Sequence, residues 1–349
     1  MMKAVAPPTN KGESLDSWSA GPLEYEDQKK WRERLNIDVS KQIRVVELAH
    51  MRYMHVDIDK ITQFLLALEN DKKIWWKGYG KYPYVYVVEK GDKPKFLGGT
   101  FRVESYAELE KAAKLPGATT ITALDDEPWG GHMVTVYDPV GYPINLMYGQ
   151  TMVEVRKEAI PPPLAINFED RKERRNAFQR FTQGLAAVHK LGHYGICYKD
   201  YDQAFDFYVR TFNLVPSDIV YAPEGDKKVD VAAFLHIDLG EEFTDHHTFF
   251  MGASPRQRVH HCSFEVHDFD TQLLGHQWLE RKGYKTVWGV GRHYLGSQIF
   301  DYWWDTTGFM IEHYADGDLV NCTTKVGKAA ANDEALSVWG PNRPIDWIK

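Results

Sequence analysis

Residues 191–197 have the sequence LGHYGIC, an apolar strand that carries one histidine. A short acidic turn follows, and then an apolar-periodic helix over 201–212. Residues 47–54, ELAHMRYM, begin the same order, with another acidic turn and an amphipathic helix predicted over 58–68. A strand with a histidine, a turn and a helix therefore occur twice, which indicates an internal repeat.

The two repeats also end alike. Residues 136–145 are VYDPVGYPIN, and residues 302–312 are YWWDTTGFMIE. Both have a D-x-x-G turn between two strands, which is typical of a hairpin. Second helices are predicted at about 106–113 and 269–282. The fold class is therefore predicted to be α+β, with duplicated βαβββ modules whose sheets curl into half-open cups.

The remaining segments flank these two modules. The predicted organisation is a polar extension at 1–44, a first module at 45–156, a linker at 157–190, a second module at 191–320 and a tail at 321–349. The extension is expected to contain a short charged helix, and the proline-rich linker a helical charge run at 171–175.

Bulk composition narrows the class of protein. The 349 residues are 43% hydrophobic and 26% charged, as in ordinary globular proteins. The net charge of −7 and the lack of a basic block argue against a nucleic-acid partner. Three cysteines are too few and too scattered for a disulfide framework or a thiolate metal site. Without a signal-like or membrane-spanning apolar run, we expect a cytoplasmic protein with no membrane partner.

Three residues of the second module are candidate metal ligands. Strand alternation gives His193, His261 and Glu312 matching positions on three strands. Two imidazoles and one carboxylate on one face, with open positions opposite, suit an oxygen-activating Fe(II) site. The same phase directs His260 the other way. A lone strand histidine is more often structural, but three such residues in the register of one duplicated motif favour a metal site.

These segments resemble the type I extradiol (catechol 2,3-) dioxygenases of the vicinal oxygen chelate superfamily. The resemblance spans about 45–320 and is most specific over 191–314. It rests on LGH at 191–193, RVHHCSFEV at 258–266, and the spacing of His293, Tyr302 and Glu312. The family's D-P-D-G turn is Asp305-Thr306-Thr307-Gly308 here, which affects no ligand.

The resemblance implies a first module without metal. Gly98 stands where His261 would align, and Asn145 stands where Glu312 would. Neither residue can replace its counterpart as a ligand for Fe(II). The first module is therefore expected to be scaffold.

The resemblance also implies catalytic and substrate-binding residues. His246 best matches the family's acid–base histidine, with His247 as the alternative. An imidazole with a pKa near neutrality can both take and return a catechol proton. Further residues are expected to contact the substrate, namely His293, Tyr302, Trp288 and Phe249. Trp288 takes the place of a carboxylate-binding arginine, so a carboxylated substrate is disfavoured.

By resemblance, the expected function is an Fe(II)-dependent dioxygenase, with Mn(II) as an alternative metal and O2 as co-substrate. It would cleave a catechol beside the diol to a 2-hydroxymuconic semialdehyde-type product, in aromatic hydrocarbon catabolism. The resemblance also implies a homo-oligomer. Two alternatives stay open: a glyoxalase-like isomerase of the same superfamily, and a metal-free protein that binds an aromatic ligand.

Overall fold

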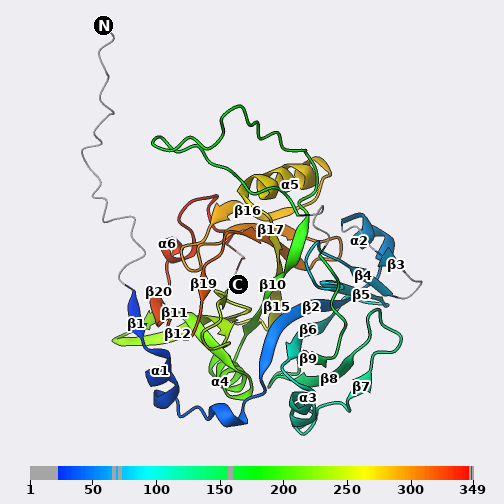
Figure 1. Cartoon of the computed structure of the whole chain (residues 1–349). Helices are drawn as coiled ribbons and strands as arrows, with labels where there is room; N and C mark the ends of the chain where they lie inside the picture. Colours follow the sequence, from blue (N-terminus) through cyan, green and yellow to red (C-terminus); the bar gives the residue numbers. More distant parts are fainter. Residues whose placement is uncertain (1–22, 65–67, 70–72, 156–159, 346, 348–349) are drawn as a thin grey trace.

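The computed structural model of the chain describes residues 23–64, 68–69, 73–155, 160–345 and 347. Most of the predicted extension (1–22) and part of the predicted 58–68 helix lie outside these residues. The described chain forms two large mixed sheets, one per module (Figure 1). No helix in this part of the chain is long and apolar enough to cross a membrane.

The first sheet has eight strands around the long strand β2. Its spatial order is β3 (Leu68–Glu69), β4 (Lys73–Trp76), β5 (Tyr86–Lys90), β2 (Val45–His55), β6 (Lys95–Val103), β9 (Pro143–Tyr148), β8 (His132–Tyr137) and β7 (Thr122–Ala123). Helices α2 (Ile58–Phe64) and α3 (Tyr106–Ala112) connect its strands, and α3 confirms the prediction of a helix at 106–113.

The second sheet has ten strands around β10. Its spatial order is β1 (Glu24–Glu26), β20 (Val326–Ala330), β11 (Leu214–Glu224), β12 (Lys227–Ile237), β14 (Phe249–Ala253), β10 (Val188–Tyr198), β15 (Arg258–Val266), β18 (Met310–Ala315), β17 (Ile299–Trp304) and β16 (Thr286–Arg292). A separate pair joins β13 (Thr244–Asp245) to β19 (Leu319–Val320). Helices α4 (Tyr201–Thr211) and α5 (Phe269–Arg281) lie where the sequence predicts them.

Both helices of the second module begin at an aspartate. The side chain of Asp200 accepts a hydrogen bond from the backbone N–H of Gln203 at the start of α4. Asp268 does the same with Thr271 at the start of α5. Each carboxylate satisfies a backbone donor that has no partner inside the helix, so the acidic residues fix where the helices leave the strands.

The strand register confirms the duplication residue by residue. In the first module, His50 on β2 lies opposite Thr100 on β6. In the second, His193 on β10 lies opposite Ser263 on β15. In both modules the central strand is parallel to one neighbour and antiparallel to the other. The modules are therefore two copies of one curled sheet, as the sequence predicts.

The segments outside the modules are packed against the second sheet. Strand β1 pairs with β20, and α1 (Gln28–Arg34) buries Trp31. A short 3-10 helix, Val39–Lys41, leads into β2. The short charged helix predicted in the extension is therefore present, and the segment predicted as a tail supplies β20 and α6 (Asp333–Leu336). The division into domains stays a prediction.

The linker differs from the prediction in one respect. Over its described part, 160–187, no helix is present, so the helical charge run predicted at 171–175 is wrong. Residues 171–175 are almost all exposed, and no apolar face is available there to stabilise a helix. The segment instead runs outside α5, where Gln183 accepts a hydrogen bond from Arg281 (Figure 1).

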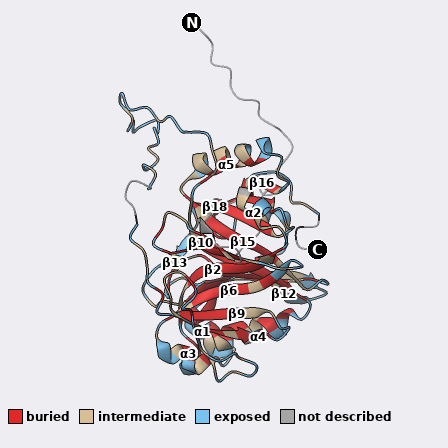
Figure 2. Cartoon of the chain, turned by 90° about the vertical axis from the view of Figure 1, so that its right-hand side faces the viewer, coloured by how far each residue is buried: buried red, intermediate tan, exposed pale blue. Residues whose placement is uncertain are grey.

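The main hydrophobic core is continuous between the modules. Tyr53 of β2 packs on Phe309 at a centroid distance of 4.4 Å, and Phe101 of β6 lies 6.0 Å from Tyr194 of β10. Figure 2 shows the buried residues as a band through the strands of both sheets, with exposed faces on the helices. The strand β10 of the second module is therefore packed against the first module through this shared core.

Candidate metal centre

The three predicted ligands converge in the cup of the second module. His193 comes from β10, His261 from β15 and Glu312 from β18, and their ligand atoms all lie within 4.8 Å of one another. Nε2 of His193 is 2.9 Å from one carboxylate oxygen of Glu312, and Nε2 of His261 is 3.5 Å from the same oxygen. Strands β15 and β18 are adjacent and parallel, and their register places Ser263 opposite Glu312. His261 is therefore not the direct cross-strand partner of Glu312.

The chemistry of this donor set fits a divalent cation. Both oxygens of Glu312 and Nε2 of His261 are buried and have no hydrogen-bond partner among the described residues. Burial opposes ionisation of Glu312, but the electrostatic interaction and hydrogen bonding with His193 beside it lower its pKa. Burial also lowers the pKa of His261 well below its usual value. Neutral imidazoles beside an ionised carboxylate are the protonation states that a divalent metal requires.

A second histidine orients the ligand His261. Nδ1 of His261 lies 2.6 Å from Nδ1 of His260, and Nε2 of His260 lies 2.5 Å from the carbonyl oxygen of Trp347. A carbonyl can only accept, so His260 donates from Nε2 and accepts at Nδ1. His261 must then donate from Nδ1, which leaves the lone pair of its Nε2 directed at Glu312. These hydrogen bonds fix His261 in the tautomer that a metal ligand needs, with the hydrogen on Nδ1 and a free Nε2.

The adjacent pair His246-His247 repeats this arrangement. Nε2 of His246 lies 2.7 Å from a carboxylate oxygen of Asp218, and its Nδ1 lies 3.2 Å from Nδ1 of His247. The His247 ring is 4.0 Å from that of His193, centroid to centroid. Of the two candidates for the acid–base role, His247 therefore lines the metal pocket, and His246 lies behind it against Asp218.

His293 and Tyr302 lie at the opposite edge of the pocket. The Tyr302 hydroxyl is 3.1 Å from Nε2 of His293, and Nδ1 of His293 donates to the carbonyl of Leu336 at 2.6 Å. Nε2 of His293 is 3.8 Å from Glu312. Both predicted residues therefore reach the candidate metal centre.

The other two predicted substrate contacts lie further away. Trp288 packs behind Tyr302 and donates from Nε1 to the carbonyl of Pro341. Phe249 is in the core, 4.3 Å from the ring of Tyr208. Its neighbour Phe250 points the other way and lines the pocket, so the structure favours Phe250 over Phe249 as a substrate contact.

The pocket has several walls that sequence reasoning missed. Beside the histidines and Tyr302 it is lined by Phe234, Phe250, Leu295, Gln298, Ala335, Leu336 and Trp347. Leu336 and Trp347 come from the segment predicted as a tail, and their carbonyls anchor His293 and His260. No motif marks such contacts, because a backbone carbonyl can come from any residue.

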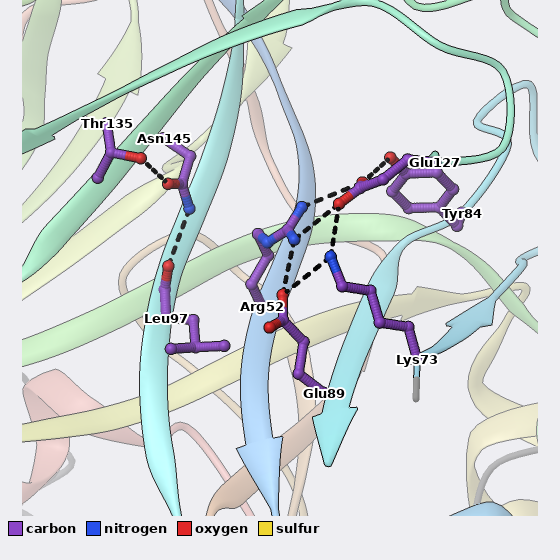
Figure 3. A network of polar contacts seen from close by, with 8 residues as sticks. All are labelled: Arg52, Lys73, Tyr84, Glu89, Leu97, Glu127, Thr135 and Asn145. Carbon is purple, nitrogen blue, oxygen red and sulfur yellow. Dashed lines mark hydrogen bonds and ion pairs between the residues drawn. The ribbon is translucent and has the colours of Figure 1, made fainter. Parts of the chain in front are cut away.

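Among the described residues of the first module, no equivalent set of metal ligands is present. Gly98 lies opposite Arg52, as His261 lies opposite Gly195, and Asn145 lies opposite Thr100, as Glu312 lies opposite Ser263. The register therefore confirms both predicted alignments. The Asn145 amide is used within the sheet: it donates to the Leu97 carbonyl and accepts from Thr135 (Figure 3).

Comparison with known protein families gives a match over part of the chain. Residues 190–313 match the family described as the Glyoxalase/Bleomycin resistance protein/Dioxygenase superfamily. This match lies in the second module, and the architecture of the chain is the vicinal oxygen chelate fold, as the sequence predicts.

Curated proteins similar to this chain include a metapyrocatechase and a biphenyl-2,3-diol 1,2-dioxygenase. Metapyrocatechase 2 of Cupriavidus necator is 32% identical over 162 residues, which cover 46% of this chain and 47% of that protein. The chain thus matches about half the length of this relative.

Two solved structures share the fold over most of the chain. Homoprotocatechuate 2,3-dioxygenase from Arthrobacter globiformis has a TM-score of 0.71 at 18% identity, covering 88% of this chain and 91% of that one. The Mn(II)-bound glyoxalase from Novosphingobium aromaticivorans has a TM-score of 0.69 at 19% identity, covering 86% and 93%. At these identities both structures support the fold alone.

Proposed function

We propose that this protein is an Fe(II)-dependent extradiol dioxygenase that opens a catechol next to its diol, with incorporation of both atoms of O2. The observation that carries the proposal is the buried set of His193, His261 and Glu312 with uncommitted ligand atoms. The similarity to a metapyrocatechase over 162 residues supports it. A 2-hydroxymuconic semialdehyde-type product and a role in aromatic catabolism belong to the same proposal, as do cytoplasmic location and homo-oligomerisation.

When bound, Fe(II) would lower the pKa of the catechol hydroxyls and bring the diol and O2 together. His193, His261 and Glu312 would hold the ion through two neutral nitrogens and one carboxylate, a set that leaves neighbouring positions open. Mn(II) accepts the same ligands and stays an alternative.

We assign the acid–base role to His247 rather than to His246. His246 accepts at Nδ1 when its Nε2–H is donated to Asp218, so His247 donates from Nδ1 and keeps a lone pair on Nε2. Burial first, and neighbouring imidazoles second, hold the pKa of His247 well below its usual value. A neutral imidazole at the pocket wall can take a proton from the diol. His246 and Asp218 would position it.

His293 and Tyr302 would bind the ring oxygens from the other side. In the chain of hydrogen bonds that starts at the Leu336 carbonyl, His293 donates from Nδ1 and accepts from the Tyr302 hydroxyl at Nε2. The hydroxyl oxygen keeps a lone pair toward the pocket. A catechol O–H can therefore donate to Tyr302, which fixes the orientation of the diol.

The residues of the first module argue against the alternative function, a glyoxalase-like isomerase. Such sites usually take ligands from two modules, whereas Gly98 and Asn145 occupy the equivalent positions here. In the second module, all three ligands lie on adjacent or next-adjacent strands.

The test is anaerobic loading with Fe(II), followed by oxygen uptake and product absorbance with catechol. We expect one O2 consumed per ring opened and a yellow semialdehyde-type product. A cis,cis-muconate product would contradict extradiol cleavage. Activity on a glutathione hemithioacetal without O2 uptake would favour the isomerase.

A further inference from the structure

A second cavity adjoins the metal pocket. The metal pocket measures about 20 Å³, whereas its neighbour measures about 200 Å³. Four residues line both cavities and form the wall between them: Phe234, Phe250, Leu336 and Trp347. The smaller space holds little more than a water-sized group, so a ring at the metal must press on this shared wall, and the larger cavity is the nearest free volume.

The lining of the larger cavity is predominantly apolar. Beyond the shared wall, its strands contribute Val220, Val231, Ala232, Gly252 and Ala253. Its charged residues are Asp333 and Arg343, which pair with each other at 2.8 Å and are partly exposed. The pair leaves no unpaired charge directed at a ligand, so the cavity suits an apolar group.

The first module shows that this volume is not inherent in the fold. In the second module, Ala232 lies opposite Gly252 on the neighbouring strand. The equivalent positions of the first module hold Lys73, which corresponds to Ala232, and Glu89, which corresponds to Gly252. Gly195, opposite Phe250 on β14, likewise corresponds to Arg52. Two glycines and an alanine of the second module therefore replace three long charged side chains.

Those charged side chains fill the cup of the first module. Arg52 donates to Glu89 at 2.8 Å and to Glu127 at 2.8 and 3.1 Å, and Lys73 donates to Glu127 at 3.2 Å (Figure 3). Tyr84 donates to Glu127 as well. The network occupies the place that is hollow in the second module, so the small residues there account for the cavity.

Gly195 is also required for the wall itself. A Cβ atom at this position would lie 2.6 Å from Cδ1 of Phe250 and 3.2 Å from Cε1 of His261. Any side chain would therefore displace both a metal-ligand ring and a residue of the shared wall. The glycine lets Phe250 face the cavities beside the metal site.

We propose that the cavity beyond the Phe234–Phe250–Trp347 wall binds an apolar alkyl or aryl substituent of the catechol. This inference rests on the proposed function, since the diol must sit at the metal for the substituent to reach the cavity. It adds the substrate class: catechols with an apolar side chain are preferred over catechol itself and over catechols with a charged side chain.

The experiment compares the iron-loaded wild type with Ala232→Leu, which fills the cavity from its floor. Its matched control is Ala123→Leu, at an exposed alanine of β7 in the first module. Binding of 3- and 4-alkylcatechols from methyl to hexyl is measured without oxygen by calorimetry, and kcat/KM is measured with oxygen. If Ala232→Leu does not fold, Ala253→Leu narrows the same cavity from a half-buried position.

We expect wild-type affinity to rise by about threefold to fourfold for each buried methylene over the first few carbons. Ala232→Leu should lose this gain while keeping the affinity for catechol, and Ala123→Leu should match the wild type. Affinity that is flat or falls with chain length overturns the inference while leaving ring opening of catechol intact. Failure to open any catechol overturns the proposed function instead.

Discussion

Two pairs of neighbouring histidines determine which ring nitrogen carries the hydrogen in His247 and His261. In each pair the first histidine is anchored at Nε2 by an acceptor, Asp218 for His246 and the Trp347 carbonyl for His260. The second histidine then has its Nδ1 occupied and its Nε2 free toward the pocket. The same arrangement of hydrogen bonds thereby presents a free Nε2 at the candidate metal centre in one pair and at the pocket wall in the other.

The duplication offers a matched test of metal binding. His193 and His50 hold equivalent register positions and are both buried, but the positions of His261 and Glu312 are occupied by Gly98 and Asn145 in the first module. We expect His193→Ala to lose stoichiometric iron after desalting, and His50→Ala to retain it, as measured by elemental analysis. Full iron retention by folded His193→Ala would refute the ligand assignment.

The acid–base assignment is tested by comparing two neighbours. His247→Asn should keep its iron and lower kcat by about a hundredfold or more, the range for loss of a general base. His246→Asn should lower kcat less, because it removes only the contact that orients His247. Should His246→Asn be the more damaging of the two, the acid–base role returns to His246, the residue that the sequence favours.

At the scale of strands, periodicity predicts the three ligands, and the resemblance to extradiol dioxygenases supplies the other predicted residues of the site. Alternation on β10, β15 and β18 selects the three ligands, and the duplicated pattern predicts Gly98 and Asn145 as their replacements. Residues 246–248 lie between β13 and β14, outside any strand, so alternation cannot choose between His246 and His247 there. Leu336 and Trp347 act through backbone carbonyls, which leave no pattern in the sequence.

The charged network of the first module makes a prediction about stability. Glu127→Gln leaves the buried Arg52 guanidinium with only part of its carboxylate shell, at a cost of about 3 kcal/mol. The control Glu104→Gln removes a carboxylate paired with Arg44 at the surface and should cost under about 1 kcal/mol. Chemical unfolding of both variants measures the difference. Equal effects would mean that the buried network contributes no more than a surface pair.

The same network makes the stability of the fold depend on pH, and the sign of the dependence follows from the pKa of Glu127. Burial alone would raise the pKa of Glu127, but the hydrogen bonds and charge of Arg52, with the charge of Lys73, lower it to about 2 from 4.5. A lowered carboxylate pKa stabilises the fold above about pH 4.5, and the contribution is lost as the pH falls toward 2. The stability gap between wild type and Glu127→Gln should therefore narrow over this window. A gap independent of pH would contradict the assignment.

At the scale of the whole molecule, the first module supports the candidate site through the shared core. Tyr194 follows the ligand His193 on β10, and its ring lies over Gly99 of the first module. A Cβ atom at Gly99 would lie 2.6 Å from Cε1 of Tyr194. Close contact between the modules therefore depends on a glycine in the first module.

Gly99→Val should accordingly weaken iron binding from a distance. The added side chain must displace Tyr194, at a cost of about 1–3 kcal/mol for overpacking, and β10 shifts with it. Gly184→Val is the control, because a Cβ atom at Gly184 meets no atom within 4 Å. We expect a lower Tm and a raised iron Kd for Gly99→Val only, measured by thermal unfolding and chelator competition. A lower Tm with unchanged iron affinity would mean that the modules share stability but that the site is positioned by the second module alone.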